Sequence, residues 1–90
     1  MRRAASLAIT LLMPRYISHH TVACLTRQAL QALIEKLKRD EMVKCVRFVS
    51  DSLEGQLLCE FEAPDKATVV AFLATHHMEP QWVMRVEQEW

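Results

Sequence analysis

The segment from Val43 to Asp65 constrains the fold of this chain more than any other stretch. Its first part is rich in the β-branched and aromatic residues that suit a pleated surface: Val43, Val46, Phe48 and Val49. Residues 51–55 are turn formers and include Gly55, the only glycine, which can adopt a positive φ at little cost. Beyond this turn, two sets of side chains alternate with a period of two: Leu57, Cys59, Phe61 and Ala63 on one face, and Gln56, Leu58, Glu60 and Glu62 on the other. The segment therefore predicts a β-hairpin.

The sequences around this hairpin predict one strand and one helix on each side. Residues 15–22 are expected to form the first strand, and apolar residues then recur with helical spacing from Thr26 to about Glu41: Leu30, Leu33, Ile34 and Leu37. After Pro64, Asp65 can cap a second helix that runs to His76, with an expected buried side of Val69, Val70, Phe72 and Leu73. Residues 82–87 suit a last strand. The order β-α-β-β-α-β predicts an α+β, ferredoxin-like domain, in which a four-stranded antiparallel sheet carries both helices on one face.

The sheet face away from the helices is expected to mediate dimerisation. If the helices cover the face that carries Leu57, Cys59 and Phe61, then Leu58, Glu60 and Glu62 point away from the helices. We expect Cys59 itself to be a small buried hydrophobe. A sheet face that mixes apolar and charged side chains should not stay bare. Two such faces packed together would form a dimeric α/β barrel around a polar-lined cavity, so the sequence predicts a homodimer.

The composition excludes several classes of partner. Ninety residues make one domain, and 11 basic residues balance 11 acidic ones, so nothing favours binding to nucleic acid or to an anionic membrane. The three cysteines at positions 24, 45 and 59 are odd in number and form no CxxC pair. Reduced thiols are therefore expected, and with them a cytoplasmic protein.

Residues 1–12 need a separate interpretation. They combine a basic start with an apolar run that is too short to span a bilayer as a helix. A leader, an amphipathic extension, and an upstream start codon ahead of a true start at Met13 are the alternatives, and we favour the last. We therefore divide the chain into an N-terminal extension, 1–12, that need not belong to the fold, and a ferredoxin-like domain, 13–90.

The four histidines form two adjacent pairs, His19-His20 and His76-His77. Imidazole is a common metal ligand, but neighbours in a strand point to opposite faces, so only one of His19 and His20 can enter a given site. Paired carboxylates at 60 and 62 are a second candidate for metal ligation or proton transfer. The alternative is that the histidines are simply hydrogen-bonded and that the carboxylates form salt bridges, for example to Arg47 and Arg85.

Several segments resemble one family of small bacterial proteins, described as nickel-binding-protein-like or of unknown function. They are Met13-Pro14-Arg15-Tyr16, Val49-Ser50-Asp51, Cys59 to Asp65, and His77 three residues before Pro80. The resemblance covers Met13 to about Glu87 and implies a ferredoxin-like dimer of the dimeric α/β-barrel superfamily. It also implies a metal site with histidines at His20 and His77. The chain departs from the family pattern in three places, where the family's aspartate, second histidine and glycine are replaced: Ser18, Leu73 and Met78.

Three functions are compatible with these features. The first is a binding protein that holds nickel, another divalent transition metal or a small ligand in a dimer cavity, with His20, His77 and Glu62 as metal ligands. The second is a cofactor-free enzyme of the monooxygenase or isomerase type, with Tyr16, His20 or Trp82 as acid or base. The third is a purely structural dimer module. The sequence contains no nucleophile elbow, P-loop or dinucleotide fingerprint, and we favour the first function.

Overall fold

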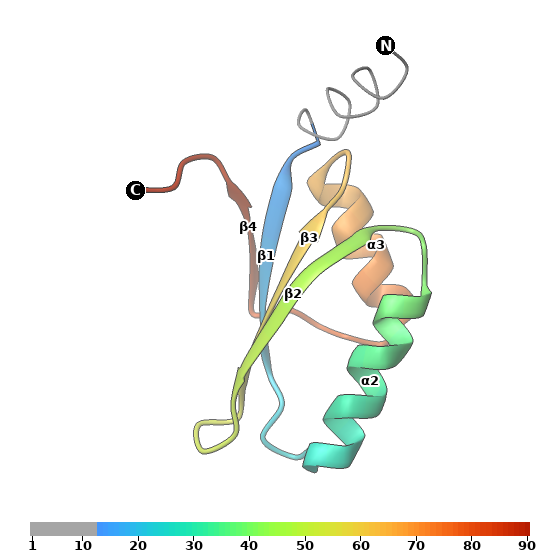
Figure 1. Ribbon diagram of the computed structural model, residues 1–90, viewed down its shortest axis with the longest axis vertical. Helices are drawn as coiled ribbons and strands as arrows, with labels where there is room; N and C mark the ends of the chain where they lie inside the picture. Colours follow the sequence, from blue (N-terminus) through green and yellow to red (C-terminus); the bar gives the residue numbers. More distant parts are fainter. Residues whose placement is uncertain (1–12) are drawn as a thin grey trace.

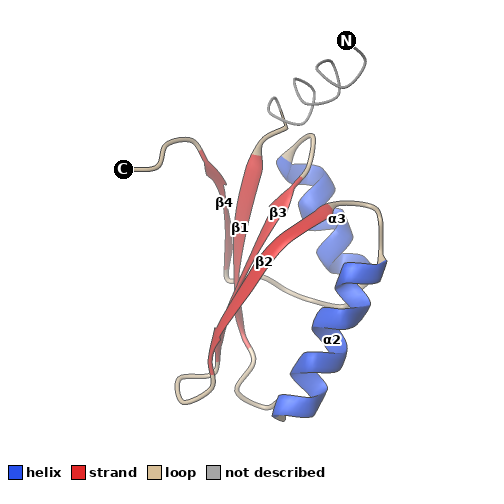
Figure 2. Cartoon of the chain, in the orientation of Figure 1, coloured by secondary structure: helices blue, strands red, loops and turns tan. Residues whose placement is uncertain are grey.

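A computed structural model describes residues 13–90 of the chain (Figure 1). The elements are β1 (Arg15–Thr21), α2 (Arg27–Arg39), β2 (Lys44–Asp51), β3 (Gln56–Glu62), α3 (Lys66–Thr75) and β4 (Trp82–Val86). The strands form one antiparallel sheet in the order β2-β3-β1-β4. Figure 2 shows both helices on the same side of the sheet. The α+β, ferredoxin-like prediction is confirmed, whereas the interpretation of residues 1–12 falls outside the described residues.

The core lies between the sheet and the two helices. The register pairs Tyr16 with Phe61, Ser18 with Cys59, and His20 with Leu57, so all six face the helices. Fully buried side chains from both helices meet this row: Leu37, Val69, Phe72 and Leu73. Val70, which we expected on the buried side of α3, is 44% exposed. That prediction was wrong because each residue advances a helix by about 100°, which turns position 70 away from its neighbour at 69.

Local signals in the sequence fix both helix starts. The Thr26 hydroxyl accepts a hydrogen bond from the Ala29 amide at 3.0 Å, which satisfies one of the free N–H groups of the first turn of α2. Asp65 does the same for α3 by accepting from the Thr68 amide at 2.8 Å. No helix within residues 13–90 has the length and apolar character that a bilayer crossing requires.

The turn between β2 and β3 requires its glycine for two reasons. Gly55 has a φ of 65°, in the left-handed region that side chains disfavour. A Cβ at this position would also lie 2.6 Å from the Cβ of Ala23. The close approach lets the Val22 amide donate to the Gly55 carbonyl at 2.7 Å, which ties the chain after β1 to the hairpin.

Candidate functional site

The helix-covered face of the sheet holds a closed polar group made of Ser18, His20 and Cys59. Ser18 and Cys59 are fully buried and His20 is 3% exposed. The Ser18 hydroxyl and His20 Nε2 are 2.8 Å apart. Burial lowers the pKa of His20, and a hydrogen bond to the Glu79 backbone opposes this only in part. The site therefore holds a neutral imidazole that solvent hardly reaches.

Cys59 behaves as a buried thiol, as expected from its face of β3. Burial raises its pKa to about 12, while a hydrogen bond from Ser18 acts in the opposite direction. Burial also raises the pKa of Cys45, although the nearby Lys38 opposes it. Because the thiolate is the reactive form of cysteine, neither residue is prepared for nucleophilic attack at neutral pH.

The three predicted metal ligands do not come together. In the β1–β3 register Glu62 lies opposite Arg15, whereas His20 is five positions further along β1. At roughly 3.4 Å per residue this separates the two positions by about 17 Å along the strand. They also lie on opposite faces, because His20 points toward the helices and Glu62 does not. The expectation that Glu62 approaches His20 across the ladder was therefore wrong.

His77 occupies the end of α3 rather than a closed site. It is exposed and has a φ of 58°, and it terminates the helix in a Schellman motif. In this motif the Met78 amide donates to the Leu73 carbonyl at 2.9 Å and the His77 amide donates to the Ala74 carbonyl at 3.0 Å. His20 contacts the backbone of Glu79, so the two histidines lie at one end of the molecule, far from Glu62. Residues 13–90 contain no group of three side chains that could hold a metal ion.

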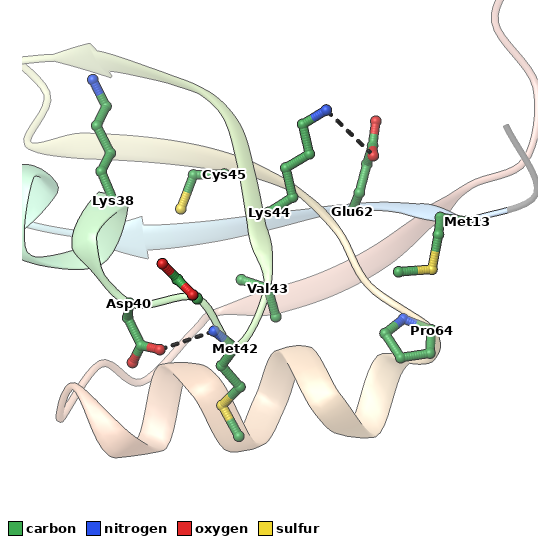
Figure 3. A pocket seen from close by; sticks show the side chains of 10 residues that line it. Met13, Lys38, Asp40, Met42, Val43, Lys44, Cys45, Glu62 and Pro64 are labelled. Carbon is green, nitrogen blue, oxygen red and sulfur yellow. Dashed lines mark hydrogen bonds and ion pairs between the residues drawn. The ribbon is translucent and has the colours of Figure 1, made fainter. Parts of the chain in front are cut away.

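Glu62 instead lines a cavity of about 600 Å³ near the start of β2 (Figure 3). Its carboxylate lies 3.9 Å from Lys44 Nζ across the rim. On the other side Asp40 accepts from the Met42 amide at 2.9 Å and contacts His76 Nε2 at 2.8 Å. Both hydrogen bonds lower the pKa of Asp40, and the one from the Met42 amide has the larger effect. The acidic groups Asp40 and Glu62 are therefore already paired with groups of the protein, which argues against a metal site in this cavity.

The helix-free face carries a different polar centre, built on Glu60. Its carboxylate is 5% exposed and accepts two hydrogen bonds of 2.8 Å, one from Arg15 Nη1 on β1 and one from Arg47 Nε on β2. Arg15 also contacts Glu89, and this hydrogen bond and charge raise the pKa of the guanidinium. The expected salt bridge to Arg47 is confirmed, whereas Arg85 lies opposite Tyr16 on the other face.

Aromatic and apolar side chains surround this Glu60 centre. His19 stacks on Trp82 with ring centroids 5.3 Å apart, and its Nε2 contacts Gln56. The His19 Nδ1 is buried, and no partner for it exists among the described residues. The apolar members of the helix-free face, some exposed and some half-buried, are Ile17, Val49, Leu58, Trp82, Met84 and Val86.

The structural comparison supports the fold. No protein-family model matches the sequence, and no curated protein matches it either. The fold is similar to that in the crystal structure of SCO4226 from Streptomyces coelicolor A3(2), with a TM-score of 0.73. The two sequences are 16% identical, and the match covers 84% of this chain and 99% of SCO4226. At this identity the similarity is evidence for the fold alone.

Proposed function

We propose that the protein is a small ligand-binding protein that acts as a homodimer, with the helix-free faces of two sheets packed together. The observation that carries this proposal is the uncovered apolar surface on that face. Val49, Trp82 and Met84 are 49%, 45% and 49% exposed, although they lie on the edge strands β2 and β4 rather than on loops, and their side chains are on the helix-free face. Contiguous apolar surface of this kind marks an interaction site.

The centre of the same face explains why the dimer would enclose a ligand. Glu60, Arg15 and Arg47 form a hydrogen-bonded ionic group in the middle of the apolar residues. Burying such a group in a dry interface is costly, since desolvation offsets most of the attraction between the charges. A polar-lined cavity between the two sheets avoids that cost and leaves room for a small molecule.

The dimer is tested by light scattering at micromolar concentration on matched variants. Met84→Lys places a charge on the helix-free face, whereas Val70→Lys places it on α3 at a similar exposure of 44%. We expect the wild type and Val70→Lys to be dimers and Met84→Lys to be a monomer. A wild type that is a monodisperse monomer, or equal behaviour of the two variants, contradicts the proposal.

A nickel-like divalent metal, together with membership of the nickel-binding-protein-like family, remains a separate proposal. Its support is the sequence resemblance from Met13 to about Glu87 and the position of His20 and His77 at one end of the molecule. The donor set does not fit a metal centre, because Glu62 lies elsewhere and His20 is buried. Calorimetric titration of Ni²⁺ and Zn²⁺ into tag-free protein tests it: heats lost in both His20→Ala and His77→Ala would establish the site, and equal heats in all three proteins would remove it.

The enzyme alternative loses two of its three expected acid or base residues. Tyr16 and His20 both face the helices, so neither lines a cavity between helix-free faces. Trp82 and His19 do lie on that face, and His19 is the histidine that such an enzyme would have available. Binding without turnover is therefore the function that the arrangement supports best.

A further inference from the structure

We propose that the cavity enclosed by the helix-free faces of the proposed dimer binds a small monoanionic carboxylate with an apolar body, and that Arg47 is the residue that recognises the carboxylate. This inference rests on the proposed ligand-binding dimer and names the chemical class of its ligand. Three features carry it: an irregularity in β2 that places Arg47, the contact that orients its guanidinium, and the apolar hollow beside it.

A β-bulge in β2 places Arg47 on the helix-free face. Cys45 pairs with Phe61 on the helix side, and the next registered pair is Arg47 with Glu60. Val46 is the extra residue between them. In a regular strand Val46 would lie opposite Glu60, and Arg47 would point toward the helices. Bulges of this kind commonly re-aim a side chain beside a functional site.

Glu60 then orients the guanidinium. Arg47 uses only its Nε, which donates to Glu60 Oε1 at 2.8 Å. Its side chain is 70% exposed, and no hydrogen bond from its two terminal nitrogens is found within residues 13–90. A guanidinium held at Nε by a buried carboxylate presents its remaining N–H groups in a fixed fork, which is the geometry that carboxylates accept bidentately.

The charges near Arg47 favour a single negative charge on the ligand. Arg15 is shared between Glu60 and Glu89, and Lys44 is near Glu62, so each of these cations already faces at least one carboxylate. Arg47 faces only Glu60, whose charge it shares with Arg15. One carboxylate on the ligand balances this incompletely neutralised cation. A dianionic phosphate would add a second negative charge next to Glu60 and Glu62.

The surroundings of Arg47 provide the apolar part of the site. A hollow of about 40 Å³ lies beside the guanidinium and is lined by Ile17, Arg47, Val49, Leu58, Cys59 and Glu60. In the next row of the sheet, Val49 pairs with Leu58, which pairs with His19, which pairs with Trp82. The ligand is therefore expected to be flat or slender, with its carboxylate at Arg47 and its apolar body along this row.

The test compares benzoate with benzamide, which has nearly the same shape and no charge. Both are titrated calorimetrically into the full-length protein in a buffer free of carboxylate and phosphate, and light scattering is recorded on the same samples. We expect the wild type to prefer benzoate by roughly 10- to 100-fold, the range that corresponds to one charge-assisted contact. Arg47→Gln should remove this preference. Arg85→Gln, a substitution of another exposed arginine on the opposite face, should preserve it.

The outcomes separate this inference from the dimer proposal. A dimeric wild type that binds both probes equally, or neither, overturns the carboxylate site and leaves the dimer intact. Loss of the preference in Arg85→Gln as large as that in Arg47→Gln also overturns it. A monomer that still prefers benzoate overturns the dimer cavity and retains Arg47 as the recognition residue, and a monomer without any preference overturns both.

Discussion

The two faces of the sheet differ in the charge of their buried polar groups. Against the helices, Ser18, His20 and Cys59 are uncharged at neutral pH, and burial holds the pKa of His20 down and that of Cys59 up. On the helix-free face, Glu60 is equally buried within the chain but lies between two arginines that reach solvent. A group sealed between sheet and helices keeps its neutral form, whereas a charge persists where partners and water remain in reach.

The first prediction concerns the neighbours Leu57 and Leu58, which point to opposite faces of β3. Leu57 is fully buried under the helices, so Leu57→Ala should cost about 2–5 kcal/mol of unfolding free energy at any protein concentration. Leu58→Ala should cost less, and its effect should grow with protein concentration, because its apolar contacts form in the dimer. Denaturant unfolding at two concentrations measures both. Equal, concentration-independent losses would show that the two faces are not different.

The second prediction concerns the charge at the centre of the helix-free face. Glu60→Gln leaves Arg15 and Arg47 without their shared carboxylate and should cost about 1–3 kcal/mol, the order of hydrogen bonds to a charged group. The loss should shrink in high salt, because the arginines are partly solvated and screening already weakens the pairs. Unfolding of both proteins in low and high salt provides the measurement, with Glu54→Gln at the exposed turn as control. No change in stability would mean that the ionic group is incidental.

The third prediction concerns protonation on the helix-covered face. Burial lowers the pKa of His20 in the folded protein, so the unfolded chain takes up a proton at higher pH than the folded one. The stabilisation that the neutral His20 contributes is therefore fully present above the ordinary histidine pKa of about 6.5 and is lost as the pH falls below it. The slope should not exceed about 1.4 kcal/mol per pH unit for this single proton.

Thermal unfolding between pH 5 and 8 measures this dependence in the wild type and in two variants. His20→Gln should flatten the curve in this range. His19→Gln changes the neighbouring residue on the other face, whose charge is the smallest of the influences on the pKa of His20, so most of the His20 contribution should remain. A wild-type curve that stays level down to pH 5 would refute the assignment of a buried neutral imidazole.

The parts of the fold that sequence predicts are those with local signals. Thr26, Asp65 and Gly55 act through contacts within a few residues or through their own φ, and the two helix starts and the turn lie where these residues predicted them. The bulge beside Arg47 was not predictable, because no local pattern distinguishes one extra residue in an edge strand of alternating character. The salt bridge to Arg47 was expected as one alternative, but the bulge that turns Arg47 toward Glu60 could not be derived.

The prediction that His20 and Glu62 share a metal site was wrong, and the sheet topology explains why. In an antiparallel pair the start of β1 lies opposite the end of β3, so Glu62 meets Arg15 and His20 meets Leu57. Counting along the predicted strands from that rule would have separated His20 from Glu62. The same count would have placed Arg15 on the face of Glu60 and so predicted Arg15 as a partner of that carboxylate.

The smallest effect is expected at His77, beyond both faces, where α3 ends. The residue holds a φ of 58°, a conformation that costs an ordinary side chain about 1–2 kcal/mol and glycine almost nothing. His77→Gly relieves this strain, but glycine also has more freedom in the unfolded chain, which opposes the gain. The net result should be a stabilisation of about 0.5–1 kcal/mol. His77→Ala keeps the strain and serves as the control, with little expected change. A stability loss in His77→Gly equal to that in His77→Ala would show instead that the imidazole makes a stabilising contact, and the metal titration of the same two variants would then identify whether an ion supplies it.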